Sequence, residues 1–83
     1  MLVIYRRAKE SVEFQNSING ETKIVTVKSY NFPSCTLDFD GTIIKGAMPE
    51  TIRVHDISIT LLYLDRGVKL GISAPKHIKV RRC

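Results

Sequence analysis

Short runs of β-branched and aromatic residues, broken at close intervals by turn residues, are the feature that most constrains how this chain can fold. Glycine, proline and asparagine punctuate the sequence, and no window of about eleven residues keeps a helical period without an interrupting glycine or proline. The candidate strands are residues 2–5, 11–14, 23–30, 36–39, 42–44, 51–54, 57–64, 68–72 and 76–82. With 83 residues, the chain is long enough for one small domain. The pattern predicts a single all-β domain, an antiparallel sandwich or barrel.

The stretch CTLDFDGTII, residues 35–44, resembles the first motif of the haloacid dehalogenase-type phosphatases. That resemblance would make Asp38 a nucleophile and Asp40 its acid/base partner. Such a site needs a parallel sheet, in which each crossover takes about a dozen residues or more, and the residues after 44 are typical of antiparallel strands. Asp40 and Gly41 instead predict a tight hairpin, because glycine adopts a positive φ without steric cost. We therefore expect no enzymatic activity.

Positive charge is concentrated at the two ends of the chain. The net charge is +5, and residues 1–9 and 76–83 hold seven of the 13 Lys and Arg residues and none of the acidic ones. This clustering predicts a polyanionic partner if the fold brings the ends together. The alternative is solvated charge that serves solubility.

Two further features concern the compartment. No apolar run approaches the roughly 18 residues of a membrane span, and the apolar run at the N-terminus precedes its basic pair, the reverse of a signal peptide. Cys35 and Cys83 lack the spacing of a metal or redox site. We expect a cytoplasmic chain with reduced thiols and no cofactor. A disulfide between subunits through Cys83 stays open.

The ends of the chain also resemble a known family. MLVIYRRAKES at the start and VKLGISAPKHIKVRR at residues 68–82 resemble the first and last strands of the carbon storage regulator (CsrA/RsmA) family, with GISAPK the most specific piece. ETIRVHD, residues 50–56, resembles the second strand and its turn, and residues 57–64 resemble the third strand. The resemblance covers roughly half of the chain.

The resemblance implies a homodimer of interleaved five-stranded chains, in which the first strand of one protomer lies beside the last strand of the other. Members of the family bind RNA at two equivalent edges and prefer a GGA element in a hairpin loop, often over a ribosome-binding site. The expected partners are messenger RNA leaders and small regulatory RNAs. The expected function is control of translation or message stability, without a catalytic activity.

Side-chain alternation agrees with such an RNA site. Ile4 and Arg6 share one face of the first strand, and Val80 and Arg82 share one face of the last. Two such edges would form an apolar floor with guanidinium groups at its end, suited to unpaired bases and phosphates. The family's RNA contacts fall on Ile4, Arg6, Arg7, Val80 and Arg82, and Lys76 is a candidate phosphate contact after the Ala-Pro turn. Alternatively, the two apolar residues are core and the arginines are solvated strand ends.

The chain also departs from the family pattern. Tyr5 replaces a small polar residue, the C-terminal helix is missing, and residues 10–49 have no counterpart, which suggests an insertion of two or three strands. KESVEF, residues 9–14, also resembles the second-strand motif, so the insertion could lie before or after that strand; we expect it before ETIRVHD. These departures leave a second function open, an interaction protein that no longer binds RNA and that pairs with or antagonises a relative.

Overall fold

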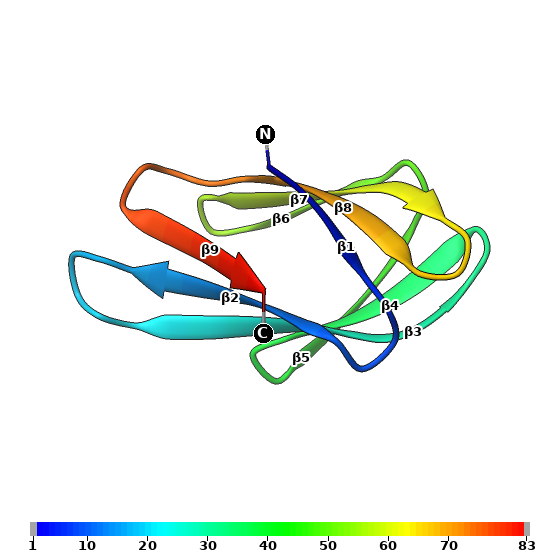
Figure 1. Ribbon diagram of the computed structural model, residues 1–83, viewed down its shortest axis with the longest axis horizontal. Coiled ribbons are helices and arrows are strands. Elements are labelled where there is room, and N and C mark those ends of the chain that lie inside the picture. Colours follow the sequence, from blue (N-terminus) through cyan, green and yellow to red (C-terminus); the bar gives the residue numbers. More distant parts are fainter. Residues whose placement is uncertain (1, 83) are drawn as a thin grey trace.

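The computed structural model describes residues 2–82, which form nine β-strands and no helix (Figure 1). The strands are β1 (Leu2–Arg6), β2 (Ser11–Asn16), β3 (Thr22–Asn31), β4 (Ser34–Phe39), β5 (Thr42–Ala47), β6 (Thr51–Val54), β7 (Ile57–Leu64), β8 (Val68–Ser73) and β9 (Ile78–Arg82). Each predicted run gives one strand, so the predicted all-β fold is confirmed. No helix within residues 2–82 is long and apolar enough to cross a membrane.

Two antiparallel sheets pack face to face as a sandwich and do not close into a barrel. One sheet has four strands in the order β1-β8-β7-β6, and the other has five in the order β5-β4-β3-β2-β9. Alternate side chains of the strands point between the sheets and form one core. Its largest fully buried side chains include Phe14, Leu37, Ile59, Leu61 and Leu70, and no charged side chain is buried among the described residues.

The aspartate motif forms a hairpin between β4 and β5, as predicted. Asp40 and Gly41 are its two turn residues, with φ of 51° and 98°. Positive φ at both positions is the geometry of the type I′ turn, whose twist matches the flanking strands. The Oδ1 atom of Asp38 accepts a hydrogen bond from the Gly41 N–H at 2.7 Å. The aspartates therefore stabilise a turn, which accounts for their spacing without catalysis.

The strands contain an internal repeat, in which β1 to β4 correspond to β5 to β8. In each half the second strand pairs with the third, and the third with the fourth. The first strand of each half pairs with the fourth strand of the other: β1 with β8, and β5 with β4. Because this exchange is mutual, the two halves have a pseudo-twofold relation. β9 lies outside the repeat, beside β2.

Matching hydrogen bonds support the repeat. Glu10 Oε1 accepts a hydrogen bond from the backbone N–H of Arg7 at 2.7 Å. In the same way, Glu50 Oε1 accepts a hydrogen bond from the backbone N–H of Ala47 at 2.8 Å. Two hydroxyl pairs also match: Ser11 with Thr26 at 2.8 Å, and Thr51 with Thr60 at 2.9 Å. Residues 2–14 therefore correspond to residues 42–54, each to the residue 40 positions later.

The repeat changes the interpretation of residues 10–49. They contribute four strands, β2 to β5, where two or three were expected, and these strands join β9 in one continuous sheet. KESVEF and ETIRVHD are the second strands of the two halves, which is why both resemble the same motif. Within one chain β1 pairs with β8 and β9 with β2, and β1 and β9 are edge strands of different sheets. Among the described strands each keeps one unpaired edge, so the homodimer in which β1 lies beside β9 of a second protomer stays a prediction.

Candidate nucleic-acid interface

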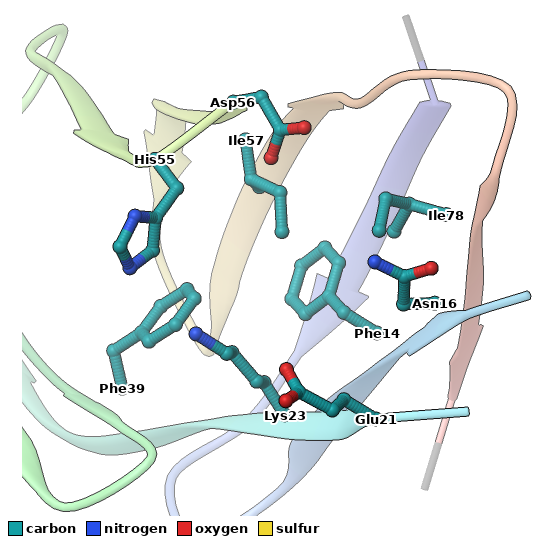
Figure 2. A pocket seen from close by; sticks show the side chains of 9 residues that line it. All are labelled: Phe14, Asn16, Glu21, Lys23, Phe39, His55, Asp56, Ile57 and Ile78. Atoms are coloured by element: carbon teal, nitrogen blue, oxygen red, sulfur yellow. The ribbon is translucent and has the colours of Figure 1, made fainter. Parts of the chain in front are cut away.

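The two basic ends of the chain, β1 and β9, are edge strands on the same side of the sandwich. The edge strands at the other side, β5 and β6, lie close to each other, because a Cβ added at Gly46 of β5 would be 3.1 Å from Cδ1 of Ile52 in β6. β1 and β9 are the other edge strands of the same two sheets. Figures 1 and 2 both draw these strands as neighbours that run in the same direction.

The turn between β1 and β2 places the arginines of both strands at one end of this edge. The backbone N–H of Glu10 donates to the carbonyl of Arg7 at 3.0 Å. Two residues later, Val12 is the Cα partner of Arg82. Arg6, Arg7 and Arg82 therefore come from opposite ends of the sequence and gather around the start of β2. We call these three residues the arginine cluster.

The side chains of the arginine cluster differ in their surroundings. Arg6 lies on the inner face of β1, where only 14% of its side chain is exposed, and its Nε donates to the Tyr5 carbonyl at 2.8 Å. The same Nε lies 3.9 Å from Oε1 of Glu10. Arg7 and Arg82 are exposed. The cluster thus offers two accessible guanidinium groups and one that is partly held by the protein.

The two apolar residues of the predicted site line the interior. Ile4 is 3% exposed and pairs with Leu70, so it belongs to the core, one of the two alternatives left open above. Val80 pairs with Phe14 and is half-buried. Val80 therefore packs at the rim of the core, partly accessible from the edge, whereas Ile4 is fully enclosed in it.

Lys76 is not brought to the arginine cluster. It lies exposed in the turn before β9, and the strand from Ile78 to Arg82 alone spans roughly 13 Å at about 3.3 Å per residue. Its neighbour His77 lies 3.7 Å from a carboxylate oxygen of Asp56. A phosphate contact by Lys76 would need an RNA that extends along the whole of β9.

Arg81 and Tyr5 lie on the outer faces of the same two strands. The guanidinium of Arg81 forms an ion pair with Glu13 of β2, so this arginine is already engaged. Tyr5, which the sequence did not mark as a site residue, is 38% exposed and lies over Gly67, where an added Cβ would be 2.6 Å from its Cζ. An exposed aromatic ring beside basic residues can stack an unpaired base. The sequence signal that could have identified Tyr5 as a site residue was its departure from the small polar residue expected at this position from the family resemblance.

A pocket with a volume of about 280 Å³ lies between the sheets, away from the arginine cluster (Figure 2). Phe14 and Phe39 line it with ring centroids 6.2 Å apart, and Lys23, His55 and Asp56 stand at its rim. None of the predicted site residues lines it. Within residues 2–82, no three His, Cys, Asp or Glu side chains could hold a metal ion together.

The described cysteine offers no nucleophile. Cys35 is buried in β4, and its burial raises the pKa of the thiol to about 11. A thiol with this pKa stays protonated at neutral pH and reacts slowly. Cys83, and with it the disulfide considered above, lies outside the described residues.

Comparisons of the chain with protein-family models, with curated proteins and with solved structures found no match.

Proposed function

We propose that this protein is a divergent relative of the carbon storage regulator family that binds single-stranded GGA elements of messenger RNA and so controls translation or message stability. The observation that carries the proposal is the arginine cluster, because the fold gathers Arg6, Arg7 and Arg82 from opposite ends of the chain. Arginine donates paired hydrogen bonds to phosphates and base edges, and Val80 and Tyr5 add apolar surface beside it. A messenger RNA target places the protein in the cytoplasm.

The proposal predicts binding that depends on both loop sequence and salt. A gel-shift series should show a GGA hairpin binding more tightly than the same hairpin with a mutated loop. If the two accessible arginines, Arg7 and Arg82, each neutralise one phosphate, the logarithm of affinity should fall with the logarithm of salt with a slope of about −1.4. Equal affinity for the two hairpins at every salt concentration would contradict the proposed recognition and leave only general attraction to polyanions.

The repeat also predicts one RNA per chain. At the equivalent edge, Gly46 and Ala47 stand where the first half has Arg6 and Arg7, and within residues 2–82 no strand corresponds to β9. Native mass spectrometry with excess hairpin should therefore find one RNA per 9.4 kDa chain, whether the protein is a monomer or the expected homodimer. Two RNAs per chain would mean that the second edge binds as well, and that the arginine cluster does not define the site.

A further inference from the structure

The outer edge of β6 is vacant at the position that β9 occupies in the other half of the repeat. β6 (Thr51–Val54) is the last strand of its sheet, whereas its counterpart β2 is covered by β9. The difference arises because the Asp40-Gly41 turn leads β4 directly into β5, which leaves no residues for a fifth strand in the first half. An uncovered edge presents N–H and C=O groups that can pair with another extended chain.

Burial shows what the missing strand would cover. Val12 and Phe14 of β2 are 1% and 2% exposed, whereas their counterparts Ile52 and Val54 of β6 are only half-buried. A pocket of about 190 Å³ lies beside Val54, with Ile44 and Phe39 among its apolar lining. Two apolar side chains at alternate positions of an added strand, like Ile78 and Val80 of β9, would point toward this surface.

The outer face of β6 carries the opposite charge to that of β2. Glu13 of β2 pairs with Arg81 of β9, and the counterpart of Glu13 in β6 is the exposed Arg53. A strand complementary to β6 therefore needs an acidic residue where β9 has Arg81. Opposite charges directly across two strands are favourable, and like charges are unfavourable.

We propose that the β6 edge binds an extended segment of a partner protein, antiparallel to β6, with the pattern apolar, any residue, apolar, acidic. A second copy of this chain fits poorly, because its edge strands carry no acidic side chain at this outer position: Tyr5 in β1, Lys45 in β5, Arg53 in β6 and Arg81 in β9. The inference stands apart from RNA binding, since β6 is the edge strand of its sheet farthest in strand order from β1 and carries no residue of the arginine cluster.

The test uses the whole chain and two labelled peptides. One has the sequence of residues 74–82, and the other has the same sequence with Arg81→Glu. By fluorescence anisotropy, the glutamate peptide should bind about tenfold more tightly than the arginine peptide. In the Arg53→Glu chain the preference should reverse, while Arg66→Glu, in the exposed turn after β7, should leave it unchanged. Circular dichroism should show that both variants keep the fold.

Hydrogen exchange then locates the peptide. Bound glutamate peptide should slow exchange of the backbone amides of residues 51–54. The proposal is overturned if the glutamate peptide does not bind, or if Arg53→Glu leaves the preference unchanged. Protection at residues 11–16 alone would mean that the peptide displaces β9 from β2. If β6 becomes protected without peptide as the protein concentration rises, its occupant is a second copy of the chain. Either result also overturns the proposal.

Discussion

Replacing Arg82 with alanine should weaken binding of a GGA hairpin roughly tenfold to a hundredfold, while the fold persists. Arg82 is exposed at the end of an edge strand, and its backbone is held opposite Val12 of β2. Loss of one guanidinium contact to a base or phosphate typically costs about 1–3 kcal/mol. Binding is measured by gel shift, and circular dichroism checks that the strand content is unchanged.

Two variants make this experiment specific. Arg82→Lys should recover part of the loss, because an ammonium keeps the charge but lacks the planar fork of the guanidinium. Arg66→Ala removes the same charge from an exposed turn outside the arginine cluster and should change affinity little. If Arg66→Ala and Arg82→Ala weaken binding equally, the attraction is diffuse electrostatics and the arginine cluster is not a site.

Leu37→Ala and Leu70→Ala should each lower the free energy of unfolding by about 2–5 kcal/mol, the usual cost of truncating a buried leucine. The two residues occupy equivalent positions in the repeat. Leu37 is 1% exposed and pairs with Ile44 of β5, and Leu70 is 0% exposed and pairs with Ile4 of β1. Similar losses, measured by urea denaturation, are expected because both side chains lie in one core shared by the two sheets.

Leu62→Ala is the matched control, since this leucine is 36% exposed and should cost much less. A domain this small has little stability to lose, so either core variant can abolish the cooperative transition altogether, which also meets the expectation. A large effect of Leu70→Ala beside no effect of Leu37→Ala would contradict a single shared core. It would mean that the five-stranded sheet tolerates a cavity that the four-stranded sheet does not.

The strands and turns of this protein could be predicted from local sequence. Short β-branched and aromatic runs between turn residues marked the strands, and alternation along the last strand placed Val80 and Arg82 on one face, as the register opposite Phe14 and Val12 confirms. The Asp40-Gly41 turn was predictable because it depends on two residues and the backbone angles they allow. For the candidate site, the sequence predicted the basic ends and the shared faces within each strand.

The pairing of strands could not be predicted in the same way. Backbone ladders use the same N–H and C=O groups whatever the side chains are, so local sequence does not say that β1 joins β8 or that β9 joins β2. Residues 10–49 therefore resembled an insertion, although they are most of one sheet. The shared motif of KESVEF and ETIRVHD was one local sign of the repeat, but its extent becomes visible only through contacts between strands, such as the matching bonds of Glu10 and Glu50.

The side chains of the site depend on the same long-range pairing. Alternation along the strand predicted which face of β1 carries Ile4. Packing against the opposing sheet then buries Ile4 in the core and leaves Val80 half-buried at its rim. Arg81 and Arg82 are adjacent in sequence and both exposed, yet it is Arg81 that forms an ion pair with Glu13 on the neighbouring strand. Strand formation follows from each residue's own backbone and side-chain preferences. Burial and charge pairing follow from neighbours many residues away, which packing between the sheets brings into contact.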